Sequence, residues 1–328
     1  MSEQHIPPAQ SMQYVATFVR DLFPDIPVQL TRVPEGVSTY VYRIITQQAT
    51  FYLRILPEVG ASFAPEVAVH TRLHLLGVKV PAVVYFEPCH KVLQRSVMVT
   101  TEIRGHAISQ SSELSPSERE RVVTAAGRDL ALINSVHVTG FGWVERQEVD
   151  TERLGAAWPT FRAFALADWV ADLAYLSQHG LTAEEIAQLE QVVVVYNTWL
   201  DGDAASLAHG DFDATHIYQE NGQYTGIIDF GEIRGANHWY DLGHFHLRDG
   251  EQLPHRLLPA LVSGYREVCS LPLDYTERIQ FTSLVINIGL LARSLRKRPA
   301  NCYTKHQFEV LRSDLTALWR PSTLLWQY

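Results

Sequence analysis

Residues 209–231 read HGDFDATHIYQENGQYTGIIDFG and contain the clearest local structure signal in the chain. Asn221-Gly222 is the dipeptide that most strongly favours a two-residue type I′ turn, and strand-forming residues lie on both sides of it. The stretch therefore predicts a β-hairpin. A loop of two residues fixes the pairing of the strands, and this pairing places His216 opposite Ile227.

Three side chains that can do chemistry lie at the base of this hairpin. Asp229 is two residues beyond Ile227, so it points to the same face as His216, at a diagonal separation of roughly 7–8 Å between Cα atoms. Asp211 lies just before the hairpin, at the mouth of the same site. The register predicts that Asp211, His216 and Asp229 converge, and that His216 and Asp229 share a small cation.

Phosphoryl transfer from a nucleotide is the chemistry that this set of residues fits. Such a reaction uses a carboxylate to orient the acceptor hydroxyl and take its proton, a metal to bridge phosphate oxygens, and positive charge to neutralise the transition state. Asp211 suits the first role. Asp229 suits metal binding, because an apolar strand that ends in Asp-Phe-Gly puts the carboxylate at the edge of the sheet. His216 is predicted to be the second metal ligand.

Composition and charge limit the class of protein. The chain has 328 residues, of which 46% are hydrophobic and 19% charged, which is enough for one large globular domain or two modest ones. The net charge of -9 arises after Arg104: up to that residue there are 9 basic and 8 acidic side chains, and beyond it 18 and 28. This balance disfavours nucleic acid as a partner. The acidic excess is compatible with a cationic small molecule as ligand, and equally with an ordinary solvated surface.

Other features of the sequence favour the cytoplasm. Cys89, Cys269 and Cys302 are far apart and form no disulfide or metal-binding pattern. The first ten residues have neither a basic nor an apolar stretch of the kind found in signal peptides. The longest nearly apolar run, 283–292, is about half of what a membrane span needs, and it indicates a buried helix.

The first hundred residues predict a small antiparallel sheet with one helix. The strand segments are rich in β-branched and aromatic residues, with turn residues between them. They cover 28–32, 40–45, 50–56, 78–86 and 92–102. The helix is expected over 64–76, where Gly77 suits its end.

Arg54 is a charged residue in an otherwise apolar strand. A buried arginine needs a partner, and Glu66 on the following helix is the nearest candidate. Arg43 is the competing choice for this role, and Arg54 as a solvated charge on an edge strand is the other alternative.

A candidate phosphate-binding loop lies between the first two strand segments. In the stretch EGVST, residues 35–39, Gly36 would allow the backbone to approach phosphates, and the hydroxyls of Ser38 and Thr39 offer hydrogen bonds. Many hairpins look like this, so the motif is weak without the rest of the pattern.

After Gly105 the pattern becomes helical. Ser115 as N-cap, Pro116 and Glu118 start one helix. Further helices are predicted over 161–175, over 184–200 with Thr182 and Glu185 as a capping box, and over 257–326 with prolines as breaks.

Taken in order, these pieces resemble the aminoglycoside phosphotransferase family of kinase-like small-molecule kinases, and the resemblance covers nearly all of the chain. It implies a nucleotide loop over 36–43. It also implies that Arg54 holds the α- and β-phosphates, with Glu66 as its acidic partner.

The same resemblance implies a hinge over 97–105, where the backbone at Thr101 and Ile103 binds the base. It further implies that the His209-Gly-Asp211 loop is catalytic and that Asp241 supports this loop.

The chain departs from the family pattern at His216, where Asn is usual, although some macrolide phosphotransferases in the family also have His. Because Mg²⁺ prefers oxygen ligands, an imidazole would coordinate it weakly and would suit Mn²⁺ better. Asp213 stands where many members have His or Gly, and Asn134 where members often have His.

The sequence therefore predicts an α+β, protein-kinase-like two-lobed fold, with a nucleotide-binding lobe over 1–104 and a helical lobe with the acceptor site over 105–328. The expected activity is transfer of the γ-phosphate of ATP or GTP, with Mg²⁺ or Mn²⁺, to a hydroxyl of a small molecule. An aminoglycoside or macrolide is the sharper hypothesis for the acceptor, and an amino alcohol, sugar or homoserine is the alternative. An inactive nucleotide-binding module is the competing class, and neither nucleic acid nor membrane is expected as a partner.

Several further sets of side chains in the C-terminal region can be interpreted in two ways, as structural or as functional. The basic residues near 293–298 indicate a solvated helix face or contact with an anionic substrate or phosphate. The tryptophans, among them Trp143 and Trp158, indicate core packing or an acceptor cleft. Glu232, Asp249 and Glu251 are candidates to bind an acceptor amine. His244 indicates a packing network rather than a second metal site.

Overall fold

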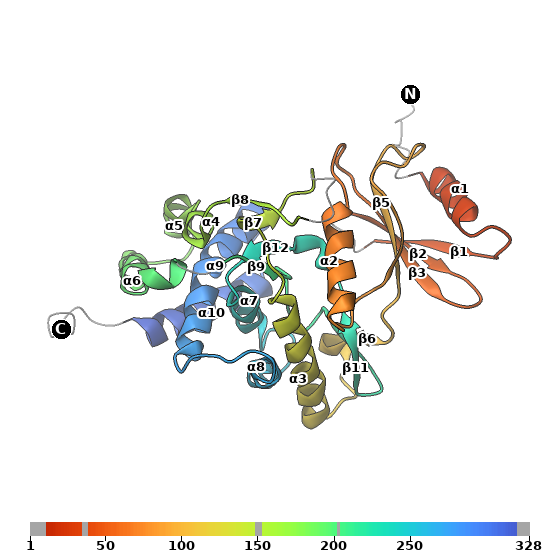
Figure 1. Cartoon of the computed structure of the whole chain (residues 1–328). Coiled ribbons are helices and arrows are strands. Elements are labelled where there is room, and N and C mark those ends of the chain that lie inside the picture. The colour runs from red at the N-terminus through yellow and green to blue at the C-terminus, as the bar shows by residue number, and fades with distance from the viewer. Residues whose placement is uncertain (1–10, 35–38, 148–152, 202–203, 320–328) are drawn as a thin grey trace.

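The computed structural model describes residues 11–34, 39–147, 153–201 and 204–319. An N-terminal antiparallel sheet is followed by a mainly helical C-terminal region (Figure 1), as the predicted α+β two-lobed fold requires. The predicted boundary after residue 104 falls between β5 (Val97–Thr101) and β6 (His106–Ala107). The division of the chain into two domains at this point stays a prediction.

The N-terminal sheet has five antiparallel strands in the order β1-β2-β3-β5-β4. Its other strands are β1 (Gln29–Val33), β2 (Tyr40–Ile45), β3 (Thr50–Ile55) and β4 (Val83–Glu87). All five overlap the predicted segments. Strand β4 begins five residues later than the predicted segment, after Pro81, which has no N–H to give to a sheet.

Each face of this sheet carries a helix. Helix α1 (Met12–Leu22), which was not predicted, packs Val15 and Phe18 against a cluster that includes Leu53 and Ile55 of β3. Successive side chains of a strand point to opposite faces, so Arg54 points away from α1. It therefore faces α2 (Ala64–Leu75), the predicted helix.

The predicted hairpin is present as β10 (Ile217–Glu220) and β11 (Gln223–Ile227), and β6 extends it into a three-stranded sheet. Asn221 and Gly222 have φ values of 52° and 73°, as a type I′ turn requires. Near the turn the pairing follows the prediction. A bulge at Tyr218/Gln219 then shifts it by one residue.

The predicted pairing of His216 with Ile227 is consequently wrong. Ile217 pairs with Ile227 instead, and the N–H of Ile228 donates to the carbonyl of His216 over 3.1 Å. The physical reason is Thr225, the extra residue that the bulge adds to β11. Alternation along the strands therefore does not bring His216 and Asp229 together.

A third sheet of four short strands, in the order β8-β7-β12-β9, was not predicted. Its members are β7 (Phe141–Val144), β8 (Ala156–Trp158), β9 (Ser206–Ala208) and β12 (Arg234–Ala236). Strands of three or four residues are too short for a periodic hydrophobic pattern. This sheet lies beside the loop 209–216, because β9 leads directly into residue 209.

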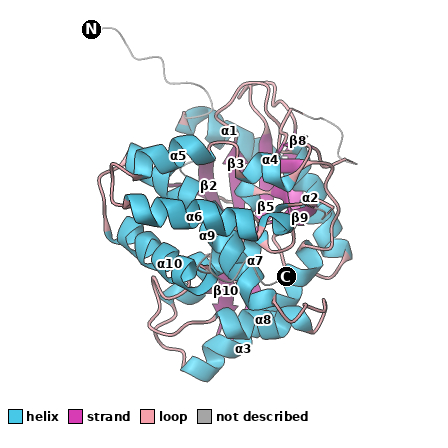
Figure 2. Cartoon of the chain, turned by 90° about the vertical axis from the view of Figure 1, so that its left-hand side faces the viewer, coloured by secondary structure: helices cyan, strands magenta, loops and turns pink. Residues whose placement is uncertain are grey.

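Helices form most of the C-terminal region, where α9 lies among α5, α7 and α10 (Figure 2). Both predicted capping boxes, at Ser115 and Thr182, are present. The predicted helix over 161–175 is broken into α4 and α5, and the one over 184–200 ends in a short 3-10 helix, η3. Within the described residues no helix is long and apolar enough to cross a membrane.

The helices of this region have the following bounds: α3 (Pro116–Ile133), α4 (Phe161–Ala165), α5 (Trp169–Leu176), α6 (Ala183–Val195), α7 (Tyr240–Arg248), α8 (Leu258–Arg266), α9 (Tyr275–Lys297) and α10 (Cys302–Leu318). The 3-10 helices are η2 (Ile108–Gln110), η3 (Asn197–Leu200) and η4 (Phe230–Glu232).

Candidate active site

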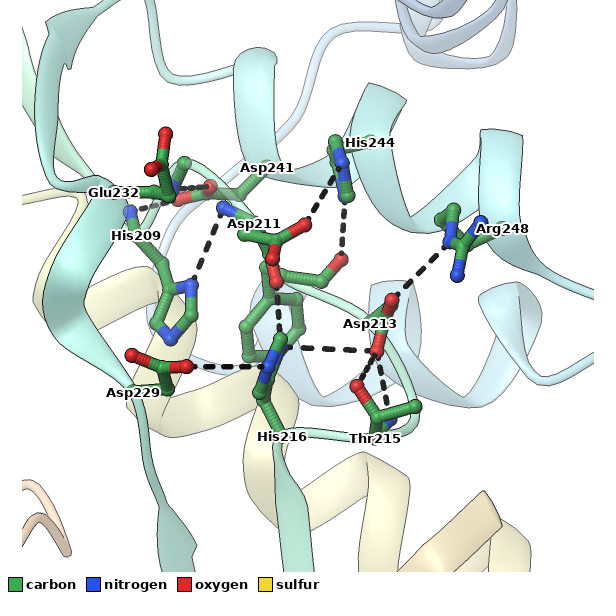
Figure 3. A network of polar contacts seen from close by, with 12 residues as sticks. His209, Asp211, Asp213, Thr215, His216, Asp229, Glu232, Asp241, His244 and Arg248 are labelled. Carbon is green, nitrogen blue, oxygen red and sulfur yellow. Dashed lines mark hydrogen bonds and ion pairs between the residues drawn. The ribbon is translucent and has the colours of Figure 1, made fainter. Parts of the chain in front are cut away.

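The loop 209–216 connects β9 to β10, and buried Asp241 on α7 holds its first turn in place (Figure 3). One carboxylate oxygen of Asp241 accepts from the N–H of His209 over 2.9 Å and from the Asn134 side chain over 3.0 Å. The other oxygen accepts from the N–H of Gly210 over 2.9 Å. The loop therefore starts on an anchored backbone, and Asn134 is part of that anchor.

Gly210 makes this turn possible. Its φ of 87° is in the left-handed region, and a Cβ at this position would lie 2.0 Å from the carbonyl oxygen of Glu232. Only glycine can provide both the conformation and the close approach. The residue that follows, Asp211, is thereby held at the surface of the loop.

Replacing Asp241 by Asn is expected to lower the free energy of unfolding by about 1–3 kcal/mol, because an amide group would point a donor at a buried backbone donor. Urea denaturation measures this loss. The control is Asp274→Asn, which removes an ion pair with Arg278 within one helix and should cost about 0–1 kcal/mol. An Asp241→Asn protein as stable as this control would show that the anchor contributes nothing.

The Asp211 carboxylate is 48% exposed, and one of its oxygens lies 3.4 Å from Nε2 of buried His244. Nδ1 of the same ring lies 3.1 Å from the carbonyl oxygen of Phe212. Because a carbonyl can only accept, Nδ1 carries a hydrogen and donates it. A proton shared between Nε2 and Asp211 would complete a hydrogen bond that orients the carboxylate. This contact was not predicted from the sequence, because a buried histidine within a helix is usually a packing residue.

His216 is fixed in a defined tautomer. Its Nδ1 lies 2.6 Å from the carbonyl oxygen of Asp211, so Nδ1 donates and the lone pair of Nε2 is free in the neutral ring. Nε2 lies 3.9 Å from a carboxylate oxygen of Asp229. A histidine that donates from one nitrogen to a carbonyl and offers the other is the usual arrangement of a metal ligand.

Asp229 joins His216 through an unusual backbone rather than through strand alternation. Its φ of 64° and ψ of 67° are left-handed, which turns the chain at the end of β11 into η4 (Phe230–Glu232). The Asp229 side chain is 56% exposed, so the cost of removing water from its carboxyl, which would raise the pKa, is limited. The positive charge of Arg54 and the nearby imidazoles hold this pKa below its usual value. The group therefore carries a negative charge near neutral pH.

Asp213 fixes the middle of the loop. It is buried and accepts hydrogen bonds from Thr215 and from Arg248, whose Nε lies 3.2 Å away. Although burial opposes its charge, His216 and Arg248 hold the pKa of Asp213 at about 2. Its buried ion pair indicates a structural role for this departure from the family pattern.

The ion pair expected between Arg54 and Glu66 is present, with 2.5 Å between Nη1 and Oε2, while Arg43 pairs with Glu102 instead. The other oxygen of Glu66 lies 2.9 Å from Arg146. Arg146 also donates to the carbonyl of Gly231 over 2.9 Å. It thus links α2 to the Asp-Phe-Gly segment. Arg146 was not predicted from the sequence, because nothing in its neighbourhood along the chain indicates a distant partner.

The other predicted nucleotide-binding residues can be placed only in part. Gly36 and Ser38 lie outside the described residues, and Thr39 is buried directly before β2. The N–H of Thr101 already donates to the carbonyl of Ala82 over 2.8 Å, whereas within the described residues no acceptor is recorded for the N–H of Ile103. That the backbone at Thr101 and Ile103 binds the base stays a prediction.

One carboxylate and one imidazole form the candidate metal site, and in the described ranges no cluster of three or more His, Cys, Asp or Glu suited to a metal ion is found. This set fits Mg²⁺ or Mn²⁺ bound with a nucleotide, because these ions commonly take one or two protein ligands and complete their shell with phosphate and water oxygens. The assignment of His216 and Asp229 as ligands stays a prediction.

Solved structures of aminoglycoside phosphotransferases share this fold. The chain is similar to aminoglycoside phosphotransferase APH(4)-Ia at 16% identity and a TM-score of 0.67, over 92% of this chain and 99% of that one. A thermostable mutant of that enzyme, in a ternary complex with ADP and hygromycin B, matches with a TM-score of 0.65, 16% identity and coverage of 91% and 98%.

The GDP complex of aminoglycoside 2′-phosphotransferase-IIIa matches at 16% identity and a TM-score of 0.60, over 94% of this chain and 99% of that one. No curated protein matches the chain. At these identities the structural matches establish the fold alone. Residues 29–279 match the model of a family described as the phosphotransferase enzyme family, APH. This match spans well over half of the chain, so the chain belongs to the APH phosphotransferase enzyme family.

Proposed function

We propose that this phosphotransferase moves the γ-phosphoryl group of ATP or GTP to a hydroxyl group of a small molecule, with Asp211 as the residue that meets the hydroxyl. The half-exposed carboxylate of Asp211 carries the proposal. It stands on an anchored loop, next to the paired His216 and Asp229. A carboxylate in this position orients an acceptor hydroxyl and takes its proton as the new bond to phosphorus forms.

The remaining residues have supporting roles in this proposal. Arg54, held by Glu66, would neutralise nucleotide phosphates, with Gly36, Ser38 and Thr39 near them, and Thr101 and Ile103 would receive the base. His216 and Asp229 would hold Mg²⁺ or Mn²⁺. A bound divalent ion would neutralise charge on the phosphate oxygens. His209 holds the loop to the sheet, because its Nε2 donates to the carbonyl of Ile228 over 2.9 Å.

Nucleotide use is tested by a coupled assay that follows ADP or GDP formation with a panel of antibiotics and cellular alcohols. We expect nucleotide consumption that depends on both a divalent ion and an acceptor. Solved relatives were described with ADP or GDP bound, and this supports ATP and GTP as the two candidate donors. An aminoglycoside or a macrolide is one candidate acceptor class. A metabolite such as an amino alcohol, a sugar or homoserine is the other, since fold does not fix the acceptor.

A nucleotide-binding module without transfer activity is the second candidate, and His216 in place of Asn is the observation that favours it. The two candidates differ in how binding depends on Asp229. If no acceptor is turned over and nucleotide affinity is the same in Asp229→Ala as in the wild type, the protein is a binding module. Loss of metal-dependent affinity in this variant supports the enzyme.

Replacing His216 by Asn should retain or raise activity with Mg²⁺ and lower the preference for Mn²⁺, because an amide oxygen replaces a nitrogen ligand. The ratio of kcat/KM with Mn²⁺ to that with Mg²⁺ should fall by about tenfold, in line with the effect of metal-site substitutions. Parallel assays with each ion measure this ratio. His306→Asn, on α10 with its Nε2 on the carbonyl of Leu247, is the control. An unchanged ratio in His216→Asn argues against coordination by His216.

A further inference from the structure

A cavity of about 350 Å³ lies beside the catalytic loop, between α9, the α4–α5 segment and the strand pair β7–β8. Arg234 and Tyr240 line it, and Arg234 reaches the loop, since a Cβ on Gly210 would lie 2.5 Å from its Nε. Trp143 lines this cavity and also a second one, of about 190 Å³, that contains Glu66, Arg146 and Gly231. The larger cavity thus borders, through Arg234, the loop that carries Asp211, and through Trp143 the predicted phosphate region, where an acceptor has to lie.

The charged side chains around this cavity are mainly basic, although the C-terminal part of the chain is acidic. Its acids are Asp168 and Asp172, and its bases are Arg234, Arg293, Arg296 and Lys297. Asp172 is buried and is neutralised by Arg296 at 2.6 Å. Arg234 pairs with Glu232 at 3.1 Å. For Arg293 and Lys297 the described residues provide no ion-pair partner, so positive charge is left over at the cavity.

Aromatic surface lies next to these charges. The guanidinium of Arg234 lies 4.8 Å from the ring centre of Trp143, and that of Arg293 lies 5.3 Å from it. Trp143 and Trp158 remain 43% and 40% exposed, a costly state for such large side chains unless a ligand covers them. A flat apolar group could stack there while an oxyanion meets the arginines.

We propose that the acceptor is an anionic small molecule, with its hydroxyl and a carboxylate or phosphonate-like oxyanion joined by a flat apolar part. This inference rests on the proposed phosphotransferase function and narrows its substrate class. A polyamine acceptor would be repelled by the unpaired cations. The three acids that were predicted to bind an amine are otherwise engaged or lie elsewhere. Asp168, the remaining acid of the cavity, can balance only one of the two bases Arg293 and Lys297. Glu232 bonds to Trp143 and Arg234, Asp249 accepts from backbone amides of α8, and Glu251 pairs with Arg248.

Four probes with the same hydroxymethylphenyl frame and different charge test the inference. They are 4-(hydroxymethyl)benzoate, 4-(hydroxymethyl)phenylphosphonate, the neutral 4-(hydroxymethyl)benzamide and the cationic 4-(aminomethyl)benzyl alcohol. Titration calorimetry with the full chain should show at least tenfold tighter binding of one anion than of the amide, with the cation weakest. The better anion identifies the oxyanion. Equal affinities, tighter binding of the cation, or no binding of either anion would overturn the inference.

Arg293→Gln should weaken binding of the preferred anion about tenfold and leave the amide unchanged. The matched control is Arg121→Gln on α3, a similarly exposed arginine that does not line the cavity. The inference fails if Arg121→Gln weakens binding of the anion as much as Arg293→Gln does. It also fails if Arg293→Gln weakens binding of the anion and of the amide equally, because no site-specific charge effect then exists.

Binding and turnover separate this inference from the function on which it rests. An anion preference in binding together with no phosphorylation of any acceptor would contradict the proposed function and leave an anion site in place. Phosphorylation restricted to neutral or cationic acceptors would support the function and overturn the inference.

Discussion

Asp211→Asn is expected to lower kcat by about 10³-fold, within the range of 10²–10⁴ usual for loss of a general base. An amide neither takes the acceptor proton nor keeps the negative charge that His244 faces at 3.4 Å. Nucleotide affinity should change less than about threefold, because Asp211 meets the acceptor rather than the nucleotide. Steady-state assays with any acceptor found in the panel measure kcat, and calorimetry with a non-hydrolysable ATP analogue measures affinity.

The exposure of Asp211 makes this substitution a clean test. The carboxylate supports no backbone group in the described structure, so the thermal midpoint should stay within a few degrees of the wild type. Should kcat of Asp211→Asn remain within threefold of the wild type, another group takes the proton and the proposed role of Asp211 is wrong.

Asp229→Asn is expected to weaken binding of Mn²⁺ in the presence of a nucleotide by about 100-fold and to lower kcat/KM by about 10³-fold, the scale of losing one preorganised electrostatic partner. The carboxylate that Arg54 and the imidazoles keep ionised is replaced by a neutral amide. Titration followed by the electron paramagnetic resonance of free Mn²⁺ measures the affinity directly.

Asp25 provides a matched control, because it is an exposed aspartate that also has a left-handed backbone, with φ of 63°. Asp25→Asn changes the same chemical group in the same conformation, far from the loop 209–216, and should leave metal affinity unchanged. Asp229→Asn with wild-type Mn²⁺ affinity would exclude Asp229 as a metal ligand.

Local sequence signals predicted much of this fold. The capping boxes at Ser115 and Thr182, the Asn-Gly turn and the five N-terminal strands depend on residues close together in the sequence. The four short strands β7, β8, β9 and β12 were missed, because each gains its stability from neighbours that are distant in the chain. Arg146 and the contact of His244 with Asp211 were missed for the same reason, because the partners Glu66 and Asp211 lie on other elements.

The hairpin prediction placed His216 and Asp229 close together, as they are in the structure, but it derived this from an incorrect strand register. It assumed a regular ladder, and no feature of the sequence indicated a bulge opposite Tyr218/Gln219. The left-handed turn at Asp229 offsets that shift and returns its carboxylate to the side of His216.

Average charge does not describe the cavity that we propose for the acceptor. The C-terminal excess of acids suggested a cationic ligand, but the cavity next to Gly210 is lined mainly by bases. Charge counted along a chain averages over the whole surface, whereas a ligand meets only the few groups that tertiary structure places around it. The basic stretch of α9 and the tryptophan of β7 become informative only once they lie together.

The left-handed backbone of residue 229 also restricts which mutations this position can accept. Among the common residues, glycine, asparagine and aspartate adopt such a φ with little strain, and most others are penalised before chemistry is considered. Aspartate is the one member of this set with a negative charge. A substitution of Asp229 therefore either strains the backbone or removes the negative charge. Almost no substitution at this position would leave both the fold and the charge unchanged.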